Sequence, residues 1–365
     1  MGTLLIELII KTFLTYKIWT MIFVIGAYGG KNSKLDGQTI KTKNIHRLLE
    51  CKAQDIIVGF DTMLLYDNPF LIFKMVWNMI RCNTLIIVPC KNSLTYIFPL
   101  AFFLSKLCGF KIIHICIGGF QLSYFLGANG EHPHKLQFRM SRRIHAFLPE
   151  MKFVETELRT KFNFNNVSYF PNFRFLDTSQ INSHKDDKLN LVFLARIMKK
   201  KGYKVVFNFA EYALKNNLNI SISFYGDIIE DDRDDFLQEI REHSANVTYG
   251  GLLQQELILT KLLDCDVMLF PTQFYEEGLP GTIIDAYSAG LPVIATRWKH
   301  ASEFIENGET GYIVSFEDPQ QEFNERIMSL YSDRQLLDKM KVKAKNAVYK
   351  YSHEYAWQIL NKYLK

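Results

Sequence analysis

Short apolar runs of strand length alternate with helical stretches along the chain, and this alternation restricts the fold more than any other feature of the sequence. Continuous apolar runs indicate strands buried on both faces, as in parallel sheets covered by helices. The first series of predicted strands comprises residues 18–25, 55–59, 84–89, 111–117, 152–154 and 167–170. After a polar stretch at 182–187, a second series comprises residues 190–194, 220–225, 246–249, 267–270, 292–296 and 312–314. Two such series predict an α/β chain with two Rossmann-like domains.

The length of 365 residues, with 48% hydrophobic content, is sufficient for two cores. We expect a first domain over residues 1–180, a second over 188–345, and a C-terminal helix at 346–365 that packs back on the first. The apolar stretch 93–108 is predicted to be a buried crossover helix rather than a membrane span, because it contains Lys106 and lies between predicted strands.

The charge is unevenly distributed. Residues 1–185 carry 22 Lys and Arg against 11 Asp and Glu, a net +11, and the remainder carries 21 against 27, a net −6. A basic half favours an anionic surface or acceptor, unless its lysines are only diffusely solvated. Without an Arg-rich helix or zinc-finger spacing, nucleic-acid readout is not expected. The six cysteines show no C-x-x-C spacing, which is typical of reduced core residues in a cytosolic protein.

The N-terminal stretch 4–25 is apolar but is interrupted by Glu7, Lys11 and Lys17, and no small-residue cleavage site follows it. It therefore fits neither a signal peptide nor a spanning helix. Residues 1–16 are interpreted as an amphipathic extension that either lies on the inner face of the plasma membrane or packs on the protein.

Residues 269–296 place two carboxylates, Glu277 and Asp285, eight positions apart across a loop-to-helix junction. The free amides at such a helix N-terminus attract a phosphate or a sugar oxygen. One acid could then bind the sugar end of a nucleotide sugar and the other the ribose. The same pattern also fits a helix cap and a solvated side chain in any doubly wound sheet.

A second candidate feature follows the strand at 190–194, where Arg196 and Lys201 lie five positions apart on a loop before a helix that begins near Tyr203. Arg with its forked donors and Lys as a point charge can clamp a diphosphate and stabilise the charge that develops on it as a leaving group. For the adjacent Lys199 and Lys200 we favour a solvated basic loop.

Two glycine loops follow predicted strands of the first domain. One contains Gly29 and Gly30, and the other contains Gly118 and Gly119. Glycine permits close approach of the backbone to a ligand, and ligands bind at the carboxyl ends of parallel strands. Neither loop has the complete G-x-G-x-x-G fingerprint, so a nicotinamide-dependent oxidoreductase is disfavoured.

Acidic clusters occur at residues 227–235 and at Asp264 and Asp266. We expect no metal site in either. The first resembles a solvated loop and helix start, and the second begins a strand, at the end opposite the predicted ligand cleft.

The C-terminal half resembles the retaining glycosyltransferases of the GT-B fold, glycosyltransferase family 4. The matching motifs include Leu194-Ala195-Arg196 through Lys201-Gly202, Phe224-Tyr225-Gly226-Asp227, Glu277-Gly278-Leu279-Pro280, Asp285-Ala286, and Ala289-Gly290-Leu291-Pro292. In the first half, Ile117-Gly118-Gly119-Phe120, Val154-Glu155-Thr156 and Phe170-Pro171-Asn172-Phe173 resemble the bacterial capsule and exopolysaccharide branch. This resemblance implies two Rossmann-like domains whose parallel sheets face each other across a cleft.

The resemblance also implies residue roles. Arg196 and Lys201 would hold the donor diphosphate, and Glu277 the hexosyl hydroxyls. Asp285 stands where the family usually has Glu, so ribose contact would need a water molecule or a closer helix. The remaining donor-site residues would be Gly29, Gly30, Gly226, Gly251, Gly278, Leu279, Pro280, Gly281 and Thr282, with Gly118 and Gly119 on the acceptor side. No residue is assigned as a catalytic His.

The expected activity is metal-independent, retaining transfer of a hexosyl group from a nucleotide-diphosphate sugar to a lipid-linked polysaccharide acceptor. No cofactor is expected beyond the donor substrate. The alternatives are a nucleotide-sugar 2-epimerase of similar fold and a noncatalytic member of a polysaccharide-assembly complex. Contact with an anionic membrane is compatible with the basic first half, and the expected location is the cytoplasm.

Overall fold

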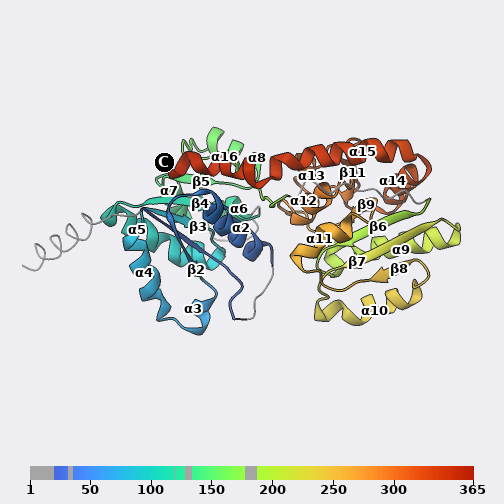
Figure 1. The fold of residues 1–365 in the computed structure, drawn as a ribbon, viewed down its shortest axis with the longest axis horizontal. Coiled ribbons are helices and arrows are strands. Elements are labelled where there is room, and N and C mark those ends of the chain that lie inside the picture. Colours follow the sequence, from blue (N-terminus) through green and yellow to red (C-terminus); the bar gives the residue numbers. More distant parts are fainter. Residues whose placement is uncertain (1–19, 32–35, 119, 128–133, 177–186) are drawn as a thin grey trace, which may run out of the picture. The chain divides into compact units, whose positions relative to one another are not determined.

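The computed structural model describes residues 20–31, 36–118, 120–127, 134–176 and 187–365 (Figure 1). It divides into two compact units. One contains the described residues up to Phe173 together with His353–Lys365, and the other contains Arg174–Ser352. Helix α16 (His353–Leu364) therefore belongs to the first unit, whereas residues 346–352 belong to the second. The predicted extension at 1–16 lies outside the described residues.

The first unit contains a parallel five-stranded sheet in the order β2-β1-β3-β4-β5. Its strands are β1 (Met21–Gly26), β2 (Ile56–Asp61), β3 (Thr84–Ile87), β4 (Lys111–Ile115) and β5 (Ala146–Leu148). From β1 the chain proceeds to β2 on one side, and from β3 it proceeds to β4 and β5 on the other. The order thus reverses between β1 and β3, and the loops after these two strands border the position where doubly wound sheets bind ligands.

The helices of the first unit reflect local sequence signals. Helix α2 begins at Gly37, because the Asp36 carboxylate accepts a hydrogen bond from the Thr39 amide at 2.9 Å and caps the helix. Helix α5 ends at Cys108, and the following Gly109, with a φ of +75°, forms a left-handed C-cap. The helices are α2 (Gly37–Lys52), α3 (Leu64–Asp67), α4 (Leu71–Arg81), η1 (Ser93–Ile97), α5 (Phe98–Cys108), α6 (Phe120–Leu126), α7 (Lys135–Ser141), α8 (Lys152–Thr160) and α16.

Two strand predictions in the first unit are wrong. Residues 152–154 open helix α8, in which Val154 and Leu158 are buried four positions apart and Glu157 pairs with Lys161 at 2.7 Å. Residues 167–170 form only an isolated bridge, between Val167 and Phe147. The fifth strand, β5, is a buried run of three residues that the sequence analysis missed.

The predicted crossover helix at 93–108 consists of η1 continuing into α5. It is buried on one side only. Leu94, Phe98 and Phe102 are in the core, whereas Phe103 and Leu107 are exposed. In the described part of the chain, no helix combines the length and the apolar character needed to cross a membrane.

The core of the first unit also contains a histidine. His114 of β4 is fully buried between the rings of Phe98 and Phe147, with centroid distances of 5.4 and 4.6 Å. Neither ring nitrogen has a hydrogen-bond partner among the described residues. Burial disfavours the charged imidazolium and lowers the pKa of His114 to about 3.

The second unit contains a parallel six-stranded sheet in the order β11-β10-β9-β6-β7-β8. Its strands are β6 (Leu189–Leu194), β7 (Ile220–Tyr225), β8 (Val247–Tyr249), β9 (Val267–Phe270), β10 (Val293–Thr296) and β11 (Gly311–Val314), which confirms all six predicted strands of this half. The order reverses between β6 and β9, so the loops after these two strands border the expected ligand position.

In the second unit, helix α9 begins at Tyr203, as the sequence predicts. The helices of this unit are η2 (Lys199–Lys201), α9 (Tyr203–Lys215), η3 (Glu230–Asp232), α10 (Arg233–Glu242), α11 (Gln255–Leu262), α12 (Gly281–Ser288), α13 (Ala301–Phe304), α14 (Gln320–Ser332), α15 (Arg334–Ala347) and η4 (Val348–Tyr351). Aromatic rings fill the core between sheet and helices, where Phe207 of α9 stacks on Phe224 of β7 at 4.9 Å.

Candidate active site

The loops after β6 and β9 meet closely in the second unit. Gly202 has a φ of +83°, and a Cβ atom built on it would lie 1.8 Å from the carbonyl oxygen of Pro271. A side chain at position 202 is therefore excluded by both the backbone conformation and the contact. The Gln273 amide donates to the carbonyl of Lys200 at 2.8 Å and joins the same two loops again.

Lys201 from the first loop and Glu277 from the second form an ion pair, with 2.5 Å between Nζ and Oε2. Both side chains are largely buried. The Thr272 hydroxyl donates to the same carboxylate oxygen at 3.3 Å, and the Lys201 ammonium lies 4.9 Å from the centre of the Phe274 ring. Two residues predicted from motifs 76 positions apart thus lie together at the switch point of the sheet.

Arg196 lies on the loop after β6, and its side chain is exposed. The loop after β7 packs against the backbone next to Arg196. A Cβ on Gly226, whose φ is +144°, would lie 1.8 Å from the carbonyl oxygen of Ala195. The Gly226 amide donates to the Gly251 carbonyl at 2.9 Å. The predicted residues Gly226 and Gly251 therefore support the backbone beside Arg196 at the carboxyl edge of the sheet.

Helix α12 begins directly after the Glu277 loop, with Pro280 as its N-cap and Gly281 as its first residue. The first N–H groups of a helix have no partner within it and attract anions. The Thr282 hydroxyl donates to the carbonyl of Leu194 at 2.9 Å, which fixes the start of α12 against the end of β6. Of the predicted donor residues in this segment, Gly278 is half-buried and Leu279 is buried.

The structure also reveals a residue that the sequence analysis did not assign. Arg174 holds Asp285 through two hydrogen bonds, Nε to Oδ1 at 2.7 Å and Nη2 to Oδ2 at 3.2 Å. Its guanidinium group covers the start of α12, since a Cβ on Gly281 would lie 2.2 Å from Nη2. Both side chains of the pair are about seven-eighths buried. The only sequence signal was the position of Arg174 directly after the Phe170-Pro171-Asn172-Phe173 motif.

This pairing changes what Asp285 can do. Each carboxylate oxygen accepts one bond from Arg174 and retains a further acceptor position for a hydroxyl. The guanidinium group in turn places a positive charge near the helix N-terminus, where the macrodipole alone already favours an anion. Binding of ribose hydroxyls by Asp285 stays a prediction.

In the first unit, the predicted glycines lie at the carboxyl ends of β1 and β4. The Asp61 carboxylate at the end of β2 accepts hydrogen bonds from the amides of Gly30, Tyr28 and Met63, at 2.7, 3.0 and 2.9 Å. Gly29 and Gly30 have positive φ values of 113° and 61°, which explains the glycine requirement there. Gly119 lies outside the described residues.

A buried ion pair lies beneath the Gly118 loop. Lys41 of α2 and Glu150 are both buried, and their Nζ and Oε2 atoms are 2.6 Å apart. Lys41 also donates to the Cys116 carbonyl at 2.9 Å, and the Gly118 amide donates to Glu150 at 3.3 Å. The pair thus connects α2, the loop after β4 and the segment after β5.

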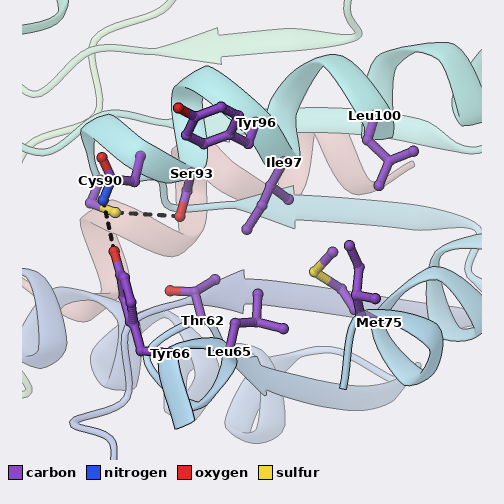
Figure 2. A pocket seen from close by; sticks show the side chains of 11 residues that line it. Thr62, Leu65, Tyr66, Met75, Cys90, Ser93, Tyr96, Ile97 and Leu100 are labelled. Carbon is purple, nitrogen blue, oxygen red and sulfur yellow. Dashed lines mark hydrogen bonds between the residues drawn. The ribbon is translucent and has the colours of Figure 1, made fainter. Parts of the chain in front are cut away.

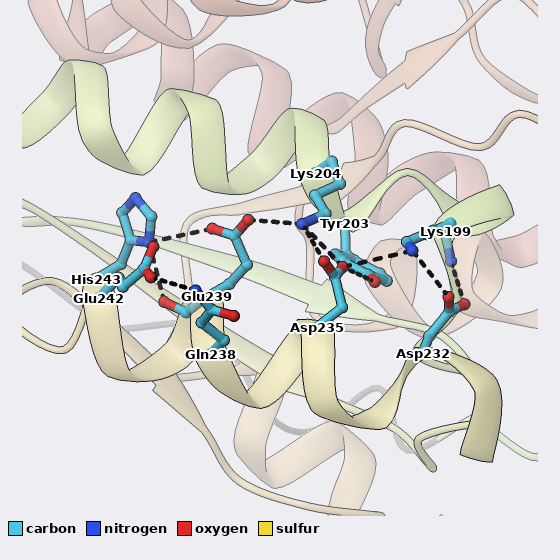
Figure 3. A network of polar contacts seen from close by, with 9 residues as sticks. All are labelled: Lys199, Tyr203, Lys204, Asp232, Asp235, Gln238, Glu239, Glu242 and His243. Carbon is cyan, nitrogen blue, oxygen red and sulfur yellow. Dashed lines mark hydrogen bonds and ion pairs between the residues drawn. The ribbon is translucent and has the colours of Figure 1, made fainter.

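The acidic cluster at 227–235 takes part in ion pairs with neighbouring lysines (Figure 3). Lys204 donates to Asp235 at 2.8 Å and to Glu239 at 2.7 Å, and the Lys199 amide donates to Asp232 at 2.7 Å. Asp266, from the second cluster, pairs with Lys341 at 2.6 Å. Within the described ranges, no group of three His, Cys, Asp or Glu side chains could hold a metal ion.

Known proteins resemble this chain in sequence over part of its length. Residues 175–347 match the family model described as Glycosyl transferases group 1. The chain is 31% identical over 138 residues to an uncharacterized 41.2 kDa protein in the cps region of Klebsiella pneumoniae, and the match covers 38% of this chain and 36% of that protein. It is 29% identical over 129 residues to the capsular polysaccharide biosynthesis glycosyltransferase CapH of Staphylococcus aureus, covering 35% and 36%. The matches thus span about a third of the length of these relatives.

A solved structure resembles nearly the whole chain. Anabaena Alr3699/HepE in complex with UDP and glucose superposes with a TM-score of 0.70 at 15% identity, covering 94% of this chain and 99% of that protein. With its two parallel-sheet units, the chain is therefore a protein of the GT-B fold class. Its residues 175–347 are similar to the Glycosyl transferases group 1 family.

Proposed function

We propose that this protein is a retaining glycosyltransferase that moves a hexosyl group from a nucleoside-diphosphate sugar to a lipid-linked acceptor in the assembly of a cell-surface polysaccharide. The contact between Lys201 and Glu277 at the switch point of the second sheet carries this proposal. It joins an ammonium that is able to bind a diphosphate to a carboxylate that is able to accept hydrogen bonds from sugar hydroxyls. The names of CapH and of the cps-region protein support a role in capsule assembly, and the UDP and glucose bound to HepE support a nucleotide-sugar donor.

In the proposed reaction, the bond between the anomeric carbon and the diphosphate oxygen breaks, and a bond from that carbon to an acceptor oxygen forms on the same face. The acceptor hydroxyl proton passes to the departing phosphate oxygen, and nucleoside diphosphate is released. Arg196 and Lys201 stabilise the charge that builds up on the diphosphate, and Glu277 accepts hydrogen bonds from the sugar hydroxyls. No protein carboxylate acts as nucleophile, in contrast to retaining glycosidases.

The Lys201–Glu277 pair has a specific consequence for donor binding. In the structure, the Lys201 ammonium partly neutralises the carboxylate that would bind the sugar. An incoming diphosphate competes for the same ammonium and releases acceptor positions on Glu277 for hydroxyl groups. Binding of the phosphates and binding of the sugar are thereby coupled through one hydrogen bond.

The proposed chemistry needs no divalent metal, because fixed cations replace it. Arg196→Ala is expected to lower kcat by about 10²-fold to 10³-fold, the cost of removing one preorganised donor from a developing anion. The test follows nucleoside diphosphate release with a lipid-linked glycan extract as acceptor, in the presence of excess chelator. Complete loss of transfer on chelation contradicts the metal-free mechanism.

The same assay separates transfer from its alternatives. Release of nucleoside diphosphate only when acceptor is present supports transfer, and an altered sugar nucleotide without acceptor identifies an epimerase. Donor binding without turnover identifies a noncatalytic subunit. Mass spectrometry of the lipid-linked glycans that accumulate when the chain is deleted identifies the acceptor and the missing sugar together.

A further inference from the structure

Helix α4 is apolar on two opposite faces. Met75 and Met79, four positions apart, are completely buried against the first unit. On the opposite face, Phe70, Phe73 and Trp77 follow the helical spacing of three and four residues and are 77%, 71% and 51% exposed. A helix that only packs on a protein core needs one apolar face, so the second face of α4 requires a separate explanation.

The neighbouring helix repeats this pattern. Tyr96 of η1 and Phe103 and Leu107 of α5 are exposed at helical spacing, Tyr96 by 75% and Leu107 by 74%. Helices α4 and α5 pack against each other. We group these exposed side chains with Tyr66 of α3 as the α4–α5 surface, defined by Tyr66, Phe70, Phe73, Trp77, Tyr96, Phe103 and Leu107.

The charges around this surface are almost all positive. Between residues 62 and 108 the chain has four basic residues, Lys74, Arg81, Lys91 and Lys106, and one acidic residue, Asp67. Asp67 itself lies 3.7 Å from the ammonium of Lys31. The Arg81 guanidinium lies 5.8 Å from the exposed Trp77 ring, and the Lys106 ammonium lies 5.1 Å from the ring of Phe102, which belongs to the core. Exposed aromatic rings with basic side chains nearby are typical of surfaces that lie at the boundary between lipid and water.

A pocket of about 280 Å³ opens in the α4–α5 surface (Figure 2). One end is polar, where Asn92 donates to the Tyr66 hydroxyl at 2.7 Å and Cys90 lies 3.3 Å from Ser93. The other end is apolar and lies between Met75 of α4 and Leu100 of α5, as Figure 2 shows. The volume lies just below the range of about 300 to 1,000 Å³ that is typical of ligand pockets, and it suits a segment of hydrocarbon chain better than a sugar nucleotide.

The pocket also lies at the functional edge of the sheet. It is lined by Thr62, directly after β2, and by Cys90, Asn92 and Ser93, in the segment after β3. The carboxyl ends of β1 and β3 border the switch point of this sheet, and Gly30 and Gly118 follow strands at the same edge. A lipid held there would bring its head group to the edge at which a ligand is expected.

We infer that the α4–α5 surface docks on an anionic lipid bilayer and that the pocket takes one hydrocarbon chain of a bilayer lipid. Aromatic side chains enter the interface between water and acyl chains, and Lys74, Arg81 and Lys106 contact the anionic head groups. The inference rests on the proposed function in one respect, because a membrane-borne acceptor explains why this edge of the sheet would face lipid.

Vesicle sedimentation tests the docking without donor or acceptor. The full chain is expected to bind vesicles of phosphatidylcholine mixed with phosphatidylglycerol, and phosphatidylcholine alone far more weakly. Phe70→Ser/Phe73→Ser/Trp77→Ser should abolish binding. The matched triple Leu252→Ser/Leu257→Ser/Val342→Ser replaces exposed apolar residues of the second unit and should retain it. Equal binding by wild type and the α4 triple variant overturns the inference.

The charge contribution is measured separately. Lys74→Gln/Arg81→Gln/Lys106→Gln should weaken binding to the anionic vesicles by about 100-fold, since each cation near an anionic surface contributes about fivefold. Binding should also weaken as salt is raised. A charge variant that binds as tightly as wild type at every salt concentration contradicts the anionic bilayer.

Two other occupants of the surface give distinct results. If residues 1–19 bind the bilayer instead, Leu5→Ser/Ile9→Ser/Phe13→Ser abolishes vesicle binding while the α4 triple variant still binds. If a second copy covers the surface, ultracentrifugation in lipid-free buffer shows a dimer that the α4 triple variant loses, and wild type does not sediment with vesicles. Either result overturns the inference.

The pocket is tested with a fluorescent fatty acid, cis-parinaric acid. Saturable binding of one molecule per chain is expected for wild type and for Leu107→Trp, which changes the exposed face. Leu100→Trp, which fills the pocket, is expected to lose this binding. Absence of saturable binding in wild type excludes the chain site. Glycosyl transfer to a short water-soluble acceptor distinguishes the two proposals, because failed docking leaves that activity intact and failed transfer leaves vesicle binding intact.

Discussion

The Arg174 guanidinium binds both carboxylate oxygens of Asp285, 111 residues further along the chain, at 2.7 and 3.2 Å. The Arg174 amide donates to the Tyr351 carbonyl at 2.9 Å, so its backbone is anchored independently of the side chain. The Arg174 guanidinium is therefore held in a fixed position at the start of α12. Asp285, to which the sequence resemblance assigns ribose binding, therefore also holds the Arg174 guanidinium beside the predicted phosphate position.

Arg174→Ala is expected to raise the KM for the nucleotide sugar by about tenfold, the equivalent of about 1.4 kcal/mol, because one charge-assisted contact to the donor is lost. The kcat should change less. Arg174→Lys should recover only part of the affinity, since a lysine cannot form the two-pronged contact. Steady-state kinetics check this, with the exposed Arg241→Ala as control. An unchanged KM in Arg174→Ala contradicts a donor role.

Glu277→Gln is expected to lower kcat/KM by about 10²-fold or more, because the amide cannot accept hydrogen bonds at both terminal atoms. Its neighbour offers a matched control. Glu276 forms an exposed ion pair with Lys299 at 2.9 Å, and Glu276→Gln should leave transfer within about twofold of wild type. Parallel kinetic assays of both variants check the difference. Similar losses of kcat/KM in the two variants would show that the effect of Glu277→Gln comes only from the change in local charge.

Removing one member of the buried Lys41–Glu150 pair should strongly destabilise the protein. Lys41→Met leaves the Glu150 carboxylate without its cation, and the expected cost is about 3 to 5 kcal/mol in the free energy of unfolding. The double variant Lys41→Met/Glu150→Leu should recover most of this loss. Urea unfolding of both variants measures these changes. The control is Lys161→Met, which removes the exposed lysine that pairs with Glu157 and is expected to cost below about 1 kcal/mol. A double variant no more stable than Lys41→Met would contradict this account.

His114 should make stability depend on pH. Its pKa of about 3 in the folded protein lies below the ordinary value of about 6.5 in the unfolded chain. Between these values the unfolded chain binds a proton that the folded protein does not, so this contribution falls as pH is lowered, by at most about 1.4 kcal/mol per pH unit. Above pH 6.5 it is constant.

Urea midpoints of wild type and His114→Leu, measured from pH 7.5 to 4.5, test the His114 contribution. The variant should gain stability relative to wild type as the pH falls. The control Ile113→Val, at the adjacent buried position of β4, should shift the midpoint equally at every pH. A constant difference between wild type and His114→Leu would show that the imidazole titrates normally in the folded state.

Sequence reasoning predicted the strands that are long and continuously apolar, because only a sheet covered on both faces buries such runs. The prediction failed for segments of three residues, which fit a strand or a helix equally well. Residues 152–154 are helical because Leu158 continues their buried face one turn later, and β5 is too short to show any period. The Lys201–Glu277 pair could be anticipated, since parallel strands bring the loops after β6 and β9 to one edge.

Other features depend on tertiary structure that no local pattern contains. Arg174 meets Asp285 only because its segment runs beside Ser352 in an isolated bridge. The apolar helices α4 and α5 gave no indication of which face would remain in water. An apolar stretch identifies a helix that can be buried, and the neighbouring elements determine how much of the helix surface is buried.

The assignment of α16 to the first unit has a consequence for biosynthesis. Ala356 and Leu360 of this helix are buried, and His145 of the first unit bonds to the carbonyl of Tyr363 at 3.1 Å. A ribosome therefore synthesises every residue of the second unit before it makes helix α16. Although N-terminal domains usually fold first during translation, the first unit here keeps an uncovered surface until α16 has been made. Stalled or truncated chains would consequently expose the first unit to aggregation while the second folds normally.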